Sequence, residues 1–439
     1  MSPVMPGHGG GPRWRSAGRV SLALGVAAIT LLAAACSSKG DDEEAPAPGA
    51  SGSATVVKTG RGISGTELTL GNLNDVTGFF AASGKDLAVA YDLFWKDYNE
   101  KNGGICKTYK VTLENADSGY NVQKATTEYA AMKTKVVAMQ MVLGSAIATA
   151  LSEDLTADDM VAIPLAWSQS ISDNPNYAIV GSTYDVEIIN GLDYLLEKNL
   201  IAKGVKIGHI YHDSEYGINA NAGVKYFAQQ NGSEVFEQKI SALQADLSSQ
   251  VTALKGNGVG VIVLTGTPTQ TSALATATQA QGLNVPLLGN GPTYTPELLN
   301  GDAKDVLLDR FHFSGPNGAL STVAGDQALA DYRTAVGKAD AIPTPAFSTG
   351  YATATVMAKI LEAACAAGDL TPAGVVAAKN SLTTLDTGGM TGKLDYSKPG
   401  ISPTRQSFIV KPDADADVRL EIVAELYEGP NAKTYTRAS

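Results

Sequence analysis

Gly144, Ser145 and Ala146 form the stretch of the sequence best suited to bind a carboxylate or another oxygen acceptor. They lie between an apolar run, Val136–Leu143, that predicts a buried strand and a helix predicted to follow Ile147. The N-terminus of such a helix offers free N–H groups, here including that of Ala146, and a partial positive charge. The Ser145 hydroxyl adds a polar group there, although Ser145 could instead be a plain helix cap worth about 1 kcal/mol. The two roles can coexist.

Two adjacent aromatic residues follow the first predicted strand. In open α/β sheets, ligands bind outside the carboxyl ends of the strands. Phe79 and Phe80 occupy such a position and could contact an apolar part of a ligand. Alternatively, they pack together as a loop staple.

No residue pattern predicts a metal site, a cofactor site or a catalytic centre. His209 and His212 are three apart on a predicted strand and therefore point to opposite faces. The acidic run Asp413–Asp417 resembles the start of a calcium loop, but Val418 and Ala424 replace the required glycine and glutamate. The sequence also lacks a nucleophile elbow, a phosphate-binding loop and a zinc-protease helix. We therefore expect neither catalysis nor a bound cofactor.

Strand and helix patterns alternate from Glu67 onward and predict an α/β fold. A strand is expected over Glu67–Leu73, and Ser83 with Asp86 predicts a helix start with a capping box. Two series of similar length imply two doubly wound lobes. We assign residues 64–183 to lobe 1 and 184–313 to lobe 2, with about 314–390 completing lobe 1 and 391–439 completing lobe 2.

The composition limits the possible partners. The 439 residues carry a net charge of −11, and 18% of them are charged. An acidic globular chain of this kind lacks the clustered basic residues that nucleic-acid binding requires, so we expect no nucleic-acid partner.

The N-terminus is predicted to be a lipoprotein signal peptide, residues 1–35. Arg13, Arg15 and Arg19 precede the apolar run Val20–Ala35, which is shorter than the roughly 20 residues of a membrane span. Cys36 follows small residues, as in a bacterial lipobox, and is the expected lipidation site. An ordinary secretory signal with a chance cysteine is the alternative. The acidic and Pro/Gly/Ser-rich residues 36–63 predict a disordered tether.

The two remaining cysteines are Cys106 and Cys365. Cys106 follows the first helix of lobe 1, and Cys365 lies near the end of a long helix expected to return to the same lobe. An even pair in an exported chain is consistent with a disulfide. Two independent buried thiols are the alternative.

Several stretches resemble, in order and spacing, the periplasmic binding proteins of branched-chain amino acid ABC transporters. The matching stretches are Thr77–Phe80, Asn99–Ile105, Glu114–Asp117, Leu143–Ala146 and Tyr211–Gly217. The resemblance covers nearly all of residues 64–439. It implies a type I periplasmic binding protein, with two lobes joined by a three-segment hinge near Tyr184, Ser314 and Thr391.

The resemblance also implies ligand contacts in two further loops. By position, Trp167 and Ser168 would supply a backbone carbonyl and a hydroxyl to the ligand, and the Trp167 indole could wall the pocket. Tyr216 would be a ligand-facing aromatic residue of lobe 2. The alternatives are that Trp167 packs in lobe 1 and that Tyr216 packs in the core at a helix N-terminus.

One position departs from the amino acid binders. They place a glutamate, which pairs with the ligand ammonium, in the loop that here reads Leu288–Tyr294, and Asn290 or Gly291 takes its place. A buried ammonium without an anionic partner is costly. The departure favours an amide, urea or an aromatic carboxylate over a simple amino acid, unless Asp213 or Glu215 substitutes.

The sequence therefore predicts a lipid-anchored, extracytoplasmic solute-binding protein without enzymatic activity. A small polar ligand bearing a carboxylate or amide would bind between the lobes, close them about the hinge and be delivered to an ABC transporter permease. The alternatives are a sensory ligand-binding module for a signalling partner and, less favoured, an exported α/β hydrolase.

Overall fold

The computed structural model describes residues 57–318 and 325–437. The predictions for the signal peptide, for Cys36 and for the tether as far as residue 56 lie outside these described residues.

The first sheet belongs to lobe 1 and is mainly parallel. Its strands run in the order β2-β3-β5-β6, and β4 pairs with the other side of β3. These strands are β2 (Ile63–Ser64), β3 (Glu67–Asn74), β4 (Lys110–Asp117), β5 (Ala138–Leu143) and β6 (Ala162–Leu165). Every residue of β5 and β6 is buried, which accounts for their continuous apolar sequences.

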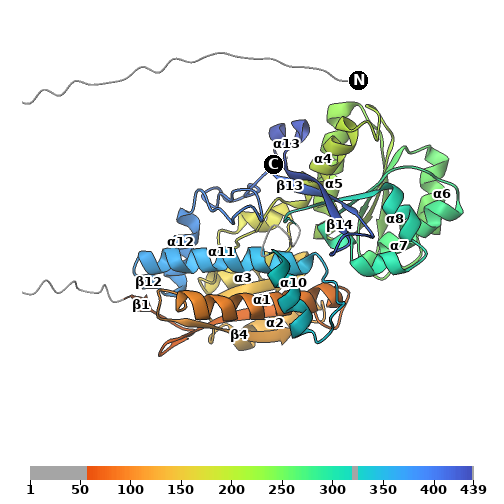
Figure 1. The fold of residues 1–439 in the computed structure, drawn as a ribbon. Helices are drawn as coiled ribbons and strands as arrows, with labels where there is room; N and C mark the ends of the chain where they lie inside the picture. The colour runs from red at the N-terminus through yellow and green to blue at the C-terminus, as the bar shows by residue number, and fades with distance from the viewer. Residues whose placement is uncertain (1–56, 319–324, 438–439) are drawn as a thin grey trace, which may run out of the picture. The chain divides into compact units, whose positions relative to one another are not determined.

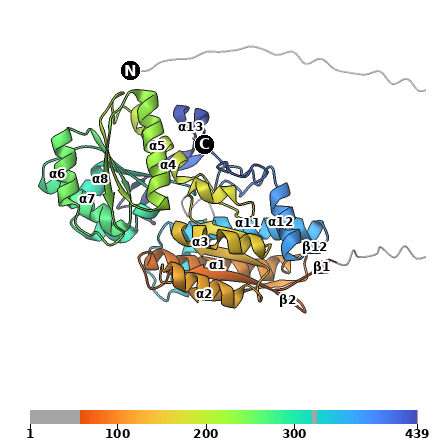
Figure 2. The same cartoon turned by 180° about the vertical axis from the view of Figure 1, so that it is seen from behind.

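Helices from distant parts of the sequence cover this sheet. Its early helices are α1 (Ala81–Asn102), α2 (Val122–Met132), α3 (Ser145–Ala157) and the short η1 (Gln169–Asp173). The late helices are α10 (Gly325–Ala335), α11 (Ala346–Ala366) and α12 (Pro372–Ser381). Figure 1 shows α11 running beside α1 with α10 next to them, and Figure 2 shows α2 and α3 on the other side of the sheet. Helices from the returning chain therefore pack beside α1 of the first sheet.

The second sheet belongs to lobe 2. Its seven described strands have the order β14-β13-β11-β10-β9-β7-β8, with β13 and β14 antiparallel at one edge. The strands are β7 (Ile207–His212), β8 (Val235–Ile240), β9 (Val261–Thr265), β10 (Leu287–Asn290), β11 (Phe311–Gly315), β13 (Ser407–Pro412) and β14 (Leu420–Tyr427). The helices are α4 (Tyr184–Glu197), α5 (Glu215–Asn231), α6 (Ser248–Asn257), α7 (Pro268–Ala280), η2 (Gly291–Thr293), η3 (Pro296–Asn300), α8 (Lys304–Arg310) and α13 (Pro430–Thr434). Two parallel, helix-covered sheets confirm the predicted fold class.

Within the described residues, three connections join the two sheets. They run from β6 to α4, from β11 to α10 and from α12 to β13. The predicted hinge positions lie on or beside them: Tyr184 begins α4, Ser314 is near the end of β11, and Thr391 is in the third connection. The first two connections touch, since a Cβ added to Gly181 would lie 2.4 Å from Cβ of Pro316.

The structure corrects the predicted end of the tether. Residues 57–63 are not a free linker, because β1 (Lys58–Thr59) pairs in parallel with β12 (Asp369–Leu370) and β2 begins at Ile63. The composition argument considered only apolar burial. Here backbone hydrogen bonds to the strand after α11, including one from Lys58 N–H to Gly368 O, hold the segment.

The predicted capping box at Ser83 is also wrong. Helix α1 begins two residues earlier, at Ala81, after an uncapped Phe80. The Asp75 carboxylate instead accepts the N–H groups of Gly78 and Phe80 just before the helix. Asp86 faces the late segments of lobe 1 and has a role in the site described below.

Cys106 and Cys365 are joined by a disulfide in the structure. The bond ties the turn after α1 to the last turn of α11. The alternative of two free thiols therefore does not apply to this structure.

Candidate functional site

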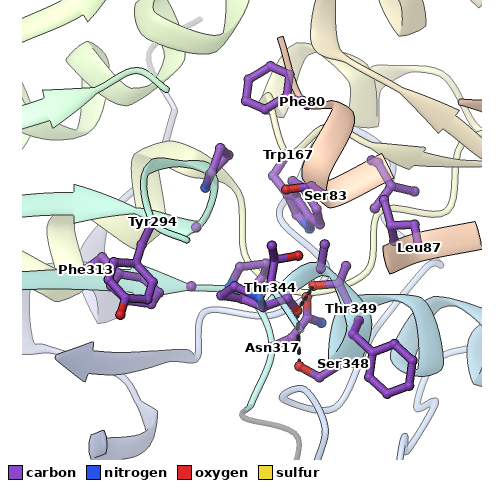
Figure 3. Close-up of a pocket in the computed structure, with 18 of the residues that line it drawn as sticks. Phe80, Ser83, Leu87, Trp167, Tyr294, Phe313, Asn317, Thr344, Ser348 and Thr349 are labelled. Atoms are coloured by element: carbon purple, nitrogen blue, oxygen red, sulfur yellow. Dashed lines mark hydrogen bonds between the residues drawn. The ribbon is translucent and has the colours of Figure 1, made fainter. Parts of the chain in front are cut away.

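A deep pocket lies where the carboxyl ends of both sheets face each other, and we call it the cleft pocket. Aromatic rings form much of its wall. They belong to Phe80, Tyr120, Trp167, Tyr184, Tyr216, Tyr294, Phe313 and Phe347. Figure 3 shows Phe313 and Tyr294 of lobe 2 on one side and Ser83 and Leu87 of α1 on the other.

The rest of the wall is aliphatic or weakly polar. The aliphatic and proline side chains are Leu87, Leu143, Leu165, Pro292, Pro316, Pro343, Pro345, Ala346, Val410, Val418 and Leu420. The polar side chains are Ser83, Ser145, Asn317, Thr344, Ser348 and Thr349. Among the described residues that line the cleft pocket, none carries a charge. A lining of this kind favours a ligand that is mostly apolar.

Tyr120 and Phe80 form one corner of the cleft pocket above Gly144. Their ring centroids are 5.1 Å apart, in an edge-to-face arrangement. Gly144 has φ 109° and ψ 134°, and a Cβ added to it would lie 2.6 Å from Cε2 of Tyr120. Only glycine therefore allows the Tyr120 ring to pack directly on the strand-to-helix turn before α3.

Trp167, Tyr184 and Tyr216 form a continuous aromatic wall across the two lobes. The ring centroids of Trp167 and Tyr184 are 6.0 Å apart, and those of Tyr184 and Tyr216 are 4.6 Å apart. The Trp167 indole donates a hydrogen bond of 2.8 Å to Val180 O, which fixes its ring. Burial raises the pKa of both phenols far above the usual range, so Tyr184 and Tyr216 stay neutral.

A second, more polar pocket adjoins the first and shares Tyr120, Ser145 and Tyr216 with it. We call it the polar pocket. Its other lining residues are Ala146, His212, Asp213, Ser214, Lys239, Ile240, Ser241, Ala242 and Gln244. Its ammonium group belongs to Lys239, whose Nζ lies 2.8 Å from Oδ1 of Asp213. The N-terminus of α3 lies where the two pockets meet.

Five of the eight predicted site residues line one of these pockets. Phe80, Ser145, Trp167 and Tyr216 line the cleft pocket, and Ala146 lines the polar pocket. These five residues follow strand ends, where the rule for open sheets places a ligand.

The other three predicted residues lie outside the walls of both pockets. Phe79 is 44% exposed and packs edge-on against Tyr120. The Ser168 hydroxyl is buried and lies 3.2 Å from the hydroxyl of Ser170. Asn290 is buried behind Tyr216, whose hydroxyl donates a hydrogen bond of 2.6 Å to its Oδ1.

The sequence reasoning missed more of the wall than it found. Tyr120 follows β4 by the same strand-end rule, so this residue could have been found. Tyr184 was assigned to the hinge alone. The local sequence does not mark the pocket-lining residues within 292–318, 343–349 and 410–420 as part of the wall. Only the return of the polypeptide brings them to the cleft.

Asp86 holds one of these late segments in place. Its carboxylate accepts hydrogen bonds of 2.7 Å from the Tyr332 hydroxyl and 2.7 Å from the Thr344 N–H. Thr344 belongs to the wall of the cleft pocket. Burial raises the pKa of Asp86, and the two hydrogen bonds oppose that rise. The contact thus anchors the pocket wall to α1.

Replacing Asp86 by alanine is expected to lower the free energy of unfolding by about 2–3 kcal/mol. Hydrogen bonds to a charged group contribute about 1.5–3 kcal/mol each, and their loss leaves buried donors without partners. Urea unfolding monitored by tryptophan fluorescence measures the change. Asp92→Ala, at an exposed position on the same helix, is the control and should change stability by less than about 0.5 kcal/mol. Equal stability of the two variants would contradict the anchoring role.

The described residues contain no cluster of metal-binding side chains. The His209 Nδ1 lies 2.8 Å from Asn221, and the His212 Nε2 lies 2.7 Å from Gln270, so the two rings have separate partners. Asp413 accepts a hydrogen bond from the Asp415 N–H in a turn before β14. No helix in the described ranges has the length and apolar character needed to cross a membrane.

Comparison with solved structures gives a consistent result. A fatty acid ABC transporter substrate-binding protein from Thermomonospora curvata is 33% identical, with a TM-score of 0.80 over 86% of this chain and 97% of that chain. A branched-chain amino acid ABC transporter protein from Thermus thermophilus with bound valine is 16% identical, with a TM-score of 0.69 over 85% of this chain and 99% of that chain. The latter likeness concerns the fold alone. A comparison with curated protein sequences found no match.

The sequence model of the family described as "Periplasmic binding protein" matches residues 67–417. This range runs from the start of β3 to the turn before β14 and includes nearly the whole wall of the cleft pocket. The chain therefore belongs to the periplasmic binding protein family, a family of extracytoplasmic solute-binding proteins.

Proposed function

We propose that the chain is the substrate-binding component of an ABC importer and that its ligand is a carboxylate with a long apolar chain. The observation that carries this proposal is the cleft pocket, whose described lining is aromatic, aliphatic or weakly polar and carries no charge. The 33% identity to the fatty acid ABC transporter substrate-binding protein from Thermomonospora curvata supports it.

The lining also distinguishes among the ligands that the sequence suggested. An amino acid would bring an ammonium group into a pocket whose described walls hold no anion, which is unfavourable. Urea and small amides would leave most of the apolar wall without contacts. A carboxylate with an apolar body satisfies both conditions, since its carboxylate can remain at the polar end of the site.

The carboxylate is placed at the N-terminus of α3, where the cleft pocket meets the polar pocket. Ser145 lines both pockets, and the exposed Ala146 follows it in the first turn. The free N–H groups of this 13-residue helix favour an anion. Lys239 on the lobe 2 side adds a positive charge. The apolar chain would then extend along the aromatic wall toward Tyr294 and Phe313.

Binding would close the two lobes about the three connections, and the closed form would dock on the permease. One hydrogen bond that supports this closure is the 3.1 Å bond from the Ser170 hydroxyl of lobe 1 to Glu215 of α5 in lobe 2. Lipidation of Cys36 would hold the protein at the membrane. Mass spectrometry of the N-terminal peptide from membrane fractions tests the anchor: an unmodified N-terminus other than Cys36 would exclude it.

Thermal unfolding of residues 37–439 with added ligands tests the proposed ligand. Palmitate at 100 times its dissociation constant should stabilise the protein by about 2.7 kcal/mol. Each methylene that is buried contributes about 0.8 kcal/mol, so affinity should fall steeply from palmitate to octanoate. Hexadecanol, which lacks the carboxylate, should bind more weakly than palmitate.

Leucine, valine, urea and benzoate complete the panel, because they represent the smaller ligands that the sequence suggested. Stabilisation by leucine or urea without any by palmitate would overturn the proposed ligand class. Equal affinity for octanoate and palmitate would show that the hydrocarbon chain of the ligand does not lie in the cleft pocket.

A further inference from the structure

Glu187 is a buried acid whose carboxyl group has no hydrogen-bond partner. It lies in the first turn of α4 and is 0% exposed, and neither of its carboxyl oxygens makes a hydrogen bond. The backbone N–H of Gly291 is close enough to lower its pKa but does not reach hydrogen-bond geometry. Burial dominates and raises the pKa of Glu187 well above its ordinary value of 4.5. Burial therefore favours the protonated, neutral form of this carboxyl group.

A second buried polar group with an unused hydrogen-bonding atom, the Asn290 side-chain amide, lies behind the aromatic wall. The Tyr216 hydroxyl lies 2.6 Å from Oδ1 of Asn290 and 3.2 Å from Gly266 O. The other end of the Asn290 amide, Nδ2, is buried and has no partner. A buried amide with one free end is costly, and the identity of its two ends is an assignment that the surrounding network decides. Asn290 therefore needs one more polar partner on the side away from Tyr216.

The packing of α4 on β10 places Glu187 on that side. A Cβ added to Gly191 would lie 2.7 Å from Cδ1 of Leu288, so Gly191 of α4 lies on the Leu288 side chain. Glu187 is one helical turn before Gly191, and Asn290 is two residues after Leu288 on the same face of the strand. Glu187 and Asn290 are therefore neighbours where α4 packs on β10, and the N–H of Gly291, the residue after Asn290, lies near the Glu187 carboxyl group. Ser314 pairs with Asn290 in the sheet, and its hydroxyl also has no partner.

We propose that Glu187 is a positioning residue for the aromatic wall: its carboxyl group hydrogen-bonds the free end of the Asn290 amide and thereby holds the Tyr216 ring in the cleft pocket. A carboxylic acid has both a donor and an acceptor, so it matches either orientation of the amide. The role of Tyr216 in binding rests on the proposed function, whereas the hydrogen-bond chain does not.

The surroundings of Glu187 favour the neutral form. The charged group that acts on it is Asp185 of the same helix, which raises its pKa further. Asp185 is itself bound by the hydroxyls of Thr183 and Tyr435. From α4 and α5, the phenols of Tyr184 and Tyr216 face Glu187, and both are neutral.

The raised pKa has a definite consequence for stability. The folded protein keeps the Glu187 proton at pH values where the unfolded chain has lost it. The contribution of this group is therefore fully present below pH 4.5 and is lost as pH rises toward the raised pKa of the folded state. A glutamine at position 187 keeps the neutral hydrogen-bonding shape and cannot lose a proton.

The experiment compares Glu187→Gln and Glu187→Leu in the full chain, with Asp193→Asn as the matched control. Asp193 is also a buried acid of α4 with a raised pKa, but it is bound by Asn431 near the C-terminus, away from both pockets. Tyrosines are labelled with ¹³C at ζ, and the Tyr216 signal is assigned through Tyr216→Phe. The signal reports the hydrogen bonding of the phenol without any ligand.

The Tyr216 signal should be nearly unchanged in Glu187→Gln and Asp193→Asn, and shifted or broadened in Glu187→Leu. Palmitate affinity should follow the same order, with Glu187→Leu weakened roughly tenfold through the loss of the hydrogen-bond chain. The unfolding temperature of Glu187→Gln should fall less between pH 5 and 8 than that of the wild type.

An identical Tyr216 signal in all three variants would overturn the inference, and so would equal palmitate affinity of Glu187→Gln and Glu187→Leu. If palmitate does not bind the wild type, the proposed ligand fails, while the ligand-free tyrosine signal still decides the role of Glu187.

Discussion

A Gly144→Ala protein should remain folded but bind palmitate at least about tenfold more weakly than the wild type. Gly144 has φ 109° and ψ 134°, a conformation that only glycine adopts readily, and strain of this kind costs about 1–3 kcal/mol. The added methyl group would also lie 2.6 Å from Cε2 of Tyr120. Tyr120 cannot retreat freely, because it packs against Phe80. Displacing its ring changes the corner of the cleft pocket beside the carboxylate site.

Isothermal titration with palmitate measures the loss of affinity. Gly232→Ala is the control, because Gly232 also has a positive φ, 67°, but a Cβ added there would meet nothing within 4 Å. Gly232 caps the C-terminal end of α5, whereas the pocket residue Tyr216 lies in the first turn of this helix. The control should lose some stability and keep its affinity. Equal palmitate affinity of the two variants would contradict the placement of the ligand beside Gly144.

The second large effect is expected from the disulfide. Replacing both Cys106 and Cys365 by serine should lower the free energy of unfolding by about 2–5 kcal/mol. The bond closes a loop across a sequence separation of 259 residues, for which the chain-entropy model gives an upper figure of about 5.5 kcal/mol. It also holds the C-terminal end of α1 against that of α11, which pack together over lobe 1.

Urea unfolding of the double variant and of the wild type measures this difference. Each single serine variant should be destabilised nearly as much as the double variant, because either change removes the same bond. The wild type under a reducing agent should match them. A double variant within about 0.5 kcal/mol of the wild type would show that packing of α1 on α11 alone fixes the two segments.

The fold could be predicted because its pattern is local. The strand expected over Glu67–Leu73 ends at Asn74, and α2 begins after Asn121, whose side chain accepts the Lys124 N–H. The spacing of apolar residues and the residues that cap helices determine such elements directly. The capping pattern at Ser83 does not predict the true start of α1, because the Asp75 carboxylate, which lies outside the helix, accepts the N–H groups of the preceding turn.

The site was predictable only in part, for a physical reason. Strand ends point to Phe80 and Ser145, since parallel strands bring their carboxyl ends to one edge, and the family resemblance points to Trp167 and Tyr216; all four line the cleft pocket. The same rule cannot tell a wall residue from one behind the wall, as Asn290 shows. It also cannot reach Val410 or Leu420, which the antiparallel edge of the second sheet brings to the cleft.

The discontinuity of lobe 1 has a consequence for how the chain is made. Its sheet is complete by residue 165, but the helices α11 and α12 that cover one face begin only at residue 346. Until α11 emerges, buried side chains of α1 such as Ala90 and Tyr91 lack the residues that they pack against, Gly350 and Thr353, and the partial lobe exposes apolar surface. A nascent chain therefore cannot finish its first lobe before most of the second has been synthesised. A polypeptide that must cross a membrane unfolded would benefit, because lobe 1 cannot be completed before α11 and α12, residues 346 to 381, have been synthesised.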